Sequence, residues 1–108
     1  MRKSTMYEIE ILSPAWADIE RIGDIHFALS GPQSALKVTN GILDSIDTLQ
    51  TFPHGYPPVP DAELAAEGFR MVIYKNYLAI YKVNGDKVSV YHVADGRTNY
   101  PQLFRNLD

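Results

Sequence analysis

The region that most constrains the fold is residues 69–97, where three runs of mostly β-branched and aromatic residues are separated by short turn signals. Such side chains suit the pleated, half-buried surface of a sheet. Asn84-Gly85 can supply the positive φ angles of a tight hairpin turn. Lys75-Asn76 is a weaker turn signal, in which asparagine tolerates the left-handed conformation. The region therefore predicts a three-stranded antiparallel meander with a basic end at Gly96-Arg97.

Length and composition indicate a single globular domain. The chain has 108 residues, of which 45% are hydrophobic and 21% charged, as is usual for such domains. We expect a disordered start over residues 1–5 and one domain over 6–108. The sequence contains no cysteine, which excludes disulfide bonds and thiolate metal sites. No apolar run approaches the roughly 20 residues that span a bilayer, and no signal-peptide core follows the basic start, so we expect a cytoplasmic protein without membrane partners.

A strand and two amphipathic helices are predicted before the meander. Residues 6–12 alternate apolar and polar, the period of a strand with one buried face. Ser13-Pro14 then offers an N-cap hydroxyl and a proline for the first helical position. A largely apolar face recurs at helical spacing on both sides of Gly31-Pro32: Ala15, Ile19, Ile22, His26 and Leu29 before it, and Ala35, Val38, Ile42, Ile46 and Leu49 after it. So short a connection predicts an antiparallel helical hairpin that covers the sheet.

Less regular segments follow the second helix. Four prolines between residues 53 and 60 rule out a helix and a central strand, so this stretch is predicted to be a stiff, extended loop. Residues 61–68 are predicted to form a loop or one helical turn, and residues 98–105 a short terminal helix. The resulting order, β-α-α-β-β-β, predicts an α+β fold in which an antiparallel sheet is covered on one face by the helical hairpin.

Charge is distributed unevenly along the chain. The formal net charge is −3, which argues against a general nucleic-acid binder because phosphate neutralisation supplies most of that affinity. Residues 1–68 hold four Lys or Arg against ten Asp or Glu, whereas residues 69–108 hold six against three. Binding of an anionic target by the basic sheet is therefore one interpretation. The alternative is that the acidic residues simply lie on solvent-exposed faces of the helices. Asp18 and Glu20 lie near the start of the first helix, where the helix dipole favours acids.

Several segments, taken in this order, resemble one protein family over roughly residues 6–104. They are Ser13-Pro14-Ala15 followed by Asp18-Ile19, the helix exit Leu49-Gln50-Thr51-Phe52-Pro53-His54-Gly55-Tyr56-Pro57, Phe69-Arg70, the strand 77–83 and the ending His92-Val93-Ala94-Asp95-Gly96-Arg97-Thr98-Asn99-Tyr100. Together they resemble the RelE/ParE superfamily of bacterial type II toxins, known also as plasmid stabilisation proteins, and are closer to the ParE type.

This resemblance implies a toxin that inhibits growth until a cognate antitoxin binds it. ParE-type members inhibit DNA gyrase, whereas RelE-type members cut messenger RNA on the ribosome. An inert, degenerate binding module of the same fold is a third interpretation. The resemblance also implies either a homodimer or a toxin–antitoxin hetero-oligomer.

Four residues are candidates for catalysis if the protein is a nuclease. Metal-independent RNA cleavage needs a base, an acid and cations around the phosphate. Arg70 and Arg97 can hold phosphate oxygens, and Tyr100 or His92 can handle protons. We expect both arginines on the sheet face away from the helices. The alternatives are a surface position for Arg70, an ion pair with Asp95 for Arg97, ring packing for Tyr100 and partial burial for His92.

Other residues point away from catalysis. Nuclease members of the resembled family tend to carry an arginine where this chain has Leu78 and Ile80, which favours the ParE type. His26 is interpreted as core or interface and His54 as exposed, and the dispersed histidines predict no metal site. No cofactor motif is present. Tyrosines in the predicted strands, Tyr74, Tyr77, Tyr81 and Tyr91, are interpreted as cross-strand packing rather than as platforms for nucleic-acid bases.

Overall fold

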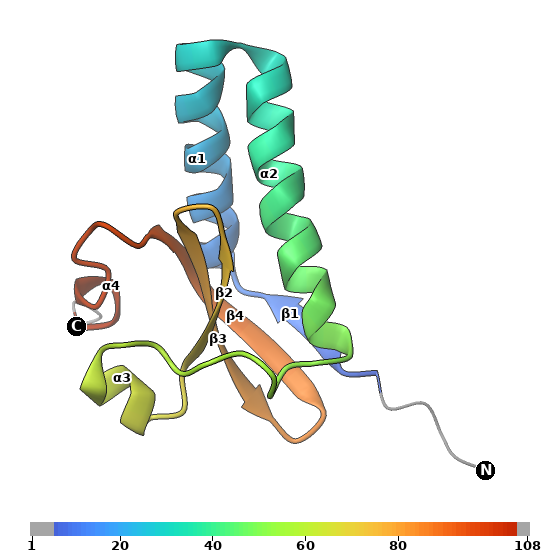
Figure 1. The fold of residues 1–108 in the computed structure, drawn as a ribbon, viewed down its shortest axis with the longest axis vertical. Helices are drawn as coiled ribbons and strands as arrows, with labels where there is room; N and C mark the ends of the chain where they lie inside the picture. The colour runs from blue at the N-terminus through green and yellow to red at the C-terminus, as the bar shows by residue number, and fades with distance from the viewer. Residues whose placement is uncertain (1–5, 106–108) are drawn as a thin grey trace.

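A four-stranded sheet forms the centre of the fold in the computed structural model, which describes residues 6–105 (Figure 1). The expected disordered start at 1–5 lies outside this range. The elements are β1 (Glu8–Ile11), α1 (Ser13–Ser30), α2 (Pro32–Asp47), the 3-10 helix η1 (Thr48–Gln50), α3 (Ala62–Ala66), β2 (Arg70–Tyr74), β3 (Tyr77–Asn84), β4 (Lys87–Asp95) and α4 (Gln102–Arg105). They confirm the predicted α+β class, the β-α-α-β-β-β order and the short terminal helix.

The strands lie in the order β1-β4-β3-β2. The pairs β2–β3 and β3–β4 are antiparallel, which confirms the meander. Strand β1 pairs with β4 in parallel, with Ile9 opposite Val88, so the prediction of a wholly antiparallel sheet was wrong. The two helices carry the chain back so that β2 runs in the same direction as β1, and the two reversals of the meander give β4 that direction again. Alternation within residues 6–12 shows which side is buried but not the direction of the partner strand.

The two turns of the meander use positive φ angles at one residue each. Gly85 has φ 61° between β3 and β4, and Lys75 has φ 56° between β2 and β3. The expected left-handed residue of that second turn was Asn76, so this detail was wrong. Asn76 instead accepts a hydrogen bond from Gly96 N–H at its backbone carbonyl, 2.8 Å away, which attaches the turn to the end of β4.

The helical hairpin covers one face of the sheet (Figure 1). Its two helices are joined at Gly31, whose φ of 92° suits glycine and whose N–H donates to Phe27 O at 2.9 Å. Helix α1 begins with Leu12 at the N-cap and no side-chain cap, so the expected Ser13 hydroxyl cap was wrong. Pro14 lies in the first turn, at the second helical position and not at the predicted first one. No helix among residues 6–105 is both long and apolar enough to cross a membrane.

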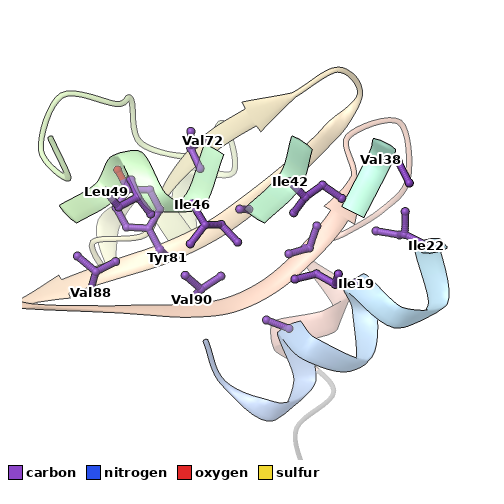
Figure 2. Packing of buried hydrophobic residues seen from close by; sticks show 13 residues of the cluster. Ile19, Ile22, Val38, Ile42, Ile46, Leu49, Val72, Tyr81, Val88 and Val90 are labelled. Carbon is purple, nitrogen blue, oxygen red and sulfur yellow. The ribbon is translucent and has the colours of Figure 1, made fainter. Parts of the chain in front are cut away.

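The main core lies between the hairpin and the sheet (Figure 2). Its members come from both helices, η1 and β2 to β4: Ala15, Ile19, Ile22, Val38, Ile42, Ile46, Leu49, Val72, Ala79, Tyr81, Val88, Val90 and Val93. A second, smaller cluster occupies the opposite face, where α3, the loop before β2 and the terminal segment pack on the strands: Val59, Leu64, Phe69, Leu78, Ile80, Ala94 and Tyr100. The face away from the hairpin is therefore partly covered, and is not the open surface expected from the sequence.

Candidate functional site

An open groove of about 880 Å³ lies between the second half of α1 and the end of β4. Its apolar lining includes Ile25 and Leu29 from α1 and Leu103 from α4. These side chains are 49%, 78% and 37% exposed respectively. Arg97, from the turn that follows β4, also lines the groove. The groove therefore combines an exposed apolar surface with one of the cations singled out in the sequence.

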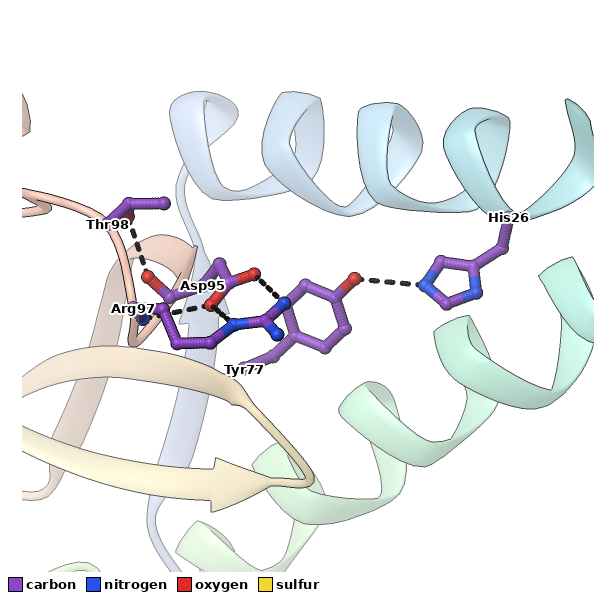
Figure 3. Close-up of polar contacts among 5 residues, drawn as sticks. All are labelled: His26, Tyr77, Asp95, Arg97 and Thr98. Atoms are coloured by element: carbon purple, nitrogen blue, oxygen red, sulfur yellow. Dashed lines mark hydrogen bonds and ion pairs between the residues drawn. The ribbon is translucent and has the colours of Figure 1, made fainter. Parts of the chain in front are cut away.

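Arg97 is held in place by Asp95, the last residue of β4 (Figure 3). Its Nε donates to Asp95 Oδ1 at 2.9 Å and its Nη2 to Oδ2 at 2.7 Å, while its backbone N–H also donates to Oδ1. These bonds lower the pKa of Asp95 to about 2, and Asp95 in turn raises the pKa of Arg97. The Arg97 side chain is nevertheless 76% exposed, against 24% for Asp95. The ion pair considered from the sequence is thus present, and it orients a cation that faces solvent.

A second polar pair lies along the same groove. His26 Nε2 and the Tyr77 hydroxyl are 2.9 Å apart, which joins α1 to the start of β3 (Figure 3). Tyr77 is also opposite Asp95 in the sheet register. Sequence reasoning assigned His26 to the core or an interface and Tyr77 to packing, and did not connect them. The only sequence signal for this contact was the position of His26, a polar side chain within the apolar stripe of the first helix.

His92 forms a hydrogen bond with a buried carboxylate and does not line the groove. Its Nδ1 lies 2.8 Å from Asp18 Oδ2, which also accepts the Val93 N–H at 2.9 Å. Arg21 donates to Asp18 Oδ1 at 2.7 Å. Although burial disfavours the charged form, these three hydrogen bonds hold the pKa of Asp18 below its ordinary value. The partly buried position expected for His92 is confirmed, whereas the burial of Asp18, at 4% exposure, was not foreseen.

Arg70 lies on the side of the sheet that the helices cover. Strand β2 alternates, so Arg70 shares its face with Val72 and Tyr74, both of which pack in the main core. Its Nη1 donates to the carbonyl oxygens of Tyr56 at 2.5 Å and His54 at 3.3 Å. The expectation that Arg70 lies on the sheet face away from the helices was therefore wrong. Counting the alternation of β2 from Val72 could have revealed this.

Tyr100 packs the terminal segment onto the second core cluster. It is 9% exposed, and burial, with a smaller effect of Asp61, raises the pKa of its hydroxyl. This matches the packing alternative weighed from the sequence. Tyr100 also lines the groove with Arg97, so these two of the four candidates lie in one region, while Arg70 and His92 lie elsewhere.

Metal binding receives no support from this geometry. Among the described residues, no group of three or more His, Asp or Glu side chains is placed to hold a metal ion. The four tyrosines named from the strands pack in or against the two hydrophobic clusters, as interpreted from the sequence.

The chain shares its fold with chains of two solved toxin–antitoxin complexes. One similar solved structure is a chain of the chromosomal ParDE toxin–antitoxin system from P. aeruginosa, with a TM-score of 0.72 and 23% identity over 85% of this chain and 98% of that one. Another is a chain of the RelBE2 toxin–antitoxin complex from Mycobacterium tuberculosis, with a TM-score of 0.61 and 12% identity over 83% of this chain and 98% of that one.

The family model of the ParE toxin of the type II toxin–antitoxin system parDE matches residues 9–100. The chain therefore belongs to the ParE toxin family, which confirms the family expected from its motifs and favours the ParE type over the RelE type. No curated protein sequence matches the chain significantly.

Proposed function

We propose that this ParE-type toxin acts in the cytoplasm by binding a protein target, DNA gyrase, and that it does not cut RNA. A cognate antitoxin neutralises it by covering its exposed apolar surface. The observation that carries this proposal is the separation of the four candidate nuclease residues: Arg97 and Tyr100 line the groove, whereas Arg70 and His92 form hydrogen bonds elsewhere in the fold.

RNA cleavage requires cations and proton-transfer groups around a single phosphate. Arg70 is opposite Tyr81 in the sheet register, whereas Asp95, which holds Arg97, is opposite Tyr77. These two positions on β3 are four residues apart, which is about 13 Å along the strand. The remaining proton-transfer candidates are His92, bound to Asp18, and Tyr100, packed in the second cluster. This separation supports a binding mechanism.

Exposed apolar side chains support a protein partner. Trp16 and Phe27 on α1, Phe52 after η1 and Ile73 on β2 are 47%, 57%, 66% and 52% exposed. Apolar side chains that are exposed singly are ordinary on a protein surface, so these positions serve as a docking surface only for a partner that reaches several of them. An antitoxin segment that folds as it binds can contact such separated positions at once.

The test is supercoiling of relaxed plasmid DNA by purified gyrase with increasing amounts of the toxin. We expect dose-dependent inhibition that is lost when the toxin is first mixed with the product of the adjacent antitoxin reading frame. A parallel primer-extension experiment on cellular messenger RNA after induction should show no new cleavage sites. Undisturbed supercoiling together with new cleavage at ribosome-bound codons would overturn the proposal.

A further inference from the structure

We propose that the groove between α1 and the end of β4 is the docking site for an amphipathic, acidic helix of the target, with Arg97 binding a carboxylate of that helix. This inference rests on the proposed function, because it identifies the surface by which the toxin would bind gyrase. Three features of the groove carry it: its apolar walls, the free side of the Arg97 guanidinium and the hydrogen bonds that already occupy the backbone at the end of β4.

The walls of the groove carry apolar side chains that are exposed to solvent. Ile25 and Leu29 are four residues apart on α1, so their side chains lie on one face of the helix. Leu103 contributes from α4 to the same groove. All three remain between 37% and 78% exposed. Burying such side chains against a partner gives the apolar centre that specific protein contacts require.

Arg97 offers a hydrogen-bonding edge that Asp95 does not use. A guanidinium has five N–H donors, which form two separate forks. Asp95 occupies the fork made by Nε and Nη2. Nothing within residues 6–105 accepts a hydrogen bond from Nη1, so the fork made by Nη1 and Nη2 is available to a second carboxylate. Figure 3 shows the Arg97–Asp95 pair and the contact of Tyr77 with His26, and all four residues line the groove.

The charges that line the groove favour an acidic ligand. The arginines Arg21 and Arg97 both line it, and their side chains are 59% and 76% exposed. Their carboxylate partners, Asp18 and Asp95, are only 6% and 24% exposed. A ligand therefore meets the guanidinium groups first, with the acids beneath them, and electrostatic complementarity of this kind guides association.

The backbone around the groove favours a helix over an extended peptide. The end of β4 that lines the groove is paired with β3 alone, because β1 pairs only with residues 87–90. Here Val93 N–H donates to Asp18 Oδ2, and the Asp95 carbonyl accepts hydrogen bonds from Thr98. Because these backbone groups are already bonded, an extended ligand cannot pair with them, and its own polar groups would lose water without replacement. A helix satisfies its own backbone and presents only side chains. Two apolar residues at a spacing of three or four, followed by an acid, would match the walls and Arg97.

Substitutions within the groove test this site in the supercoiling assay. Arg97→Glu should raise the toxin concentration for half inhibition by at least about tenfold, and Leu29→Gln by a smaller factor. Arg97→Lys should be intermediate, because it keeps the charge but loses the two-pronged bond. The matched controls are Lys37→Glu and Leu36→Gln, at exposed positions of α2 outside the groove. Circular dichroism and thermal melts should show all variants folded like the wild type.

Each outcome separates the two proposals. Inhibition by the wild type but equally by Arg97→Glu and Leu29→Gln would overturn the groove as the target site and leave the proposed function standing. No inhibition by the wild type would overturn the proposed function and, with it, this inference. Groove variants that inhibit gyrase normally but no longer bind the antitoxin would assign the groove to the antitoxin, and would equally refute our assignment.

Discussion

Asp18 is the residue whose setting differs most from what its sequence position indicates. An acid near the start of a helix is ordinarily explained by the helix dipole. Here its carboxylate is buried and accepts hydrogen bonds from His92, Val93 N–H and Arg21. It thereby links α1 to β4, next to the groove, so the position of one groove wall depends on a buried polar contact.

We predict that Asp18→Asn lowers the free energy of unfolding by about 2–4 kcal/mol at pH 7, because it leaves buried donors without a charged acceptor. Since the folded pKa of Asp18 is lowered, its stabilising contribution is present above the unfolded pKa of about 3.9 and is lost as pH falls through the folded pKa. The difference between wild type and variant in urea denaturation should therefore shrink below about pH 4. Exposed Asp24→Asn is the matched control, and an equal effect of both variants would contradict this role.

The candidate site was predictable only where contacts are local in sequence. The Asp95–Arg97 pair spans two residues, so its formation could be weighed from the sequence alone. Asp18 and His92 are 74 positions apart, and His26 and Tyr77 are 51 apart. Neither pair carries a spacing that would reveal it, because each depends on how the hairpin lies on the sheet. Arg70 was misplaced for another reason: its charge was given more weight than the alternation of β2.

At the scale of elements, α2 is fitted to the sheet at Gly41. A Cβ built at Gly41 would lie 2.1 Å from the Tyr74 ring, so the helix approaches β2 at this point only because glycine has no side chain. The sequence predicted both elements from their hydrophobic periods. It contained no sign of this close approach, since an isolated glycine in a helical pattern is also read as a weak point in the helix.

We predict that Gly41→Ala destabilises the protein by about 1–3 kcal/mol through overpacking, although alanine favours helix by up to about 1 kcal/mol. Exposed Asn40→Ala is the control and should be neutral or slightly stabilising. In a Tyr74→Ala background, Gly41→Ala should become neutral or stabilising, because the ring it would meet is gone. Chemical denaturation of the four proteins of this cycle measures the coupling. Additive effects would show that Tyr74 is not the obstacle.

At the scale of the whole molecule, one sheet separates two hydrophobic clusters of unequal size. The order of elements, the class of the fold and the hairpin were predictable because hydrophobic periods and turn residues are local signals. The second cluster was not, because it is assembled from a proline-rich loop, a helical turn and the terminal segment. Tyr81 connects the proline-rich loop to the main core. It is fully buried in that core (Figure 2), and its hydroxyl donates to Pro53 O of the loop at 2.6 Å.

We predict that the Tyr81 hydroxyl makes the folded state sensitive to alkali. Burial raises its pKa from 10.0 to about 12, so the unfolded chain releases this proton at lower pH than the folded one. Its contribution to stability is complete below pH 10 and is lost as pH rises towards 12, by about 2–3 kcal/mol in total. Tyr81→Phe should be less stable by about 1–2 kcal/mol at pH 7, where Pro53 O loses its donor, but should lose less stability between pH 10 and 12. Urea denaturation at a series of pH values compares the two proteins with all other tyrosines and lysines unchanged. Parallel alkaline losses in both would mean that the proton leaves Tyr81 as readily in the folded core as in the unfolded chain.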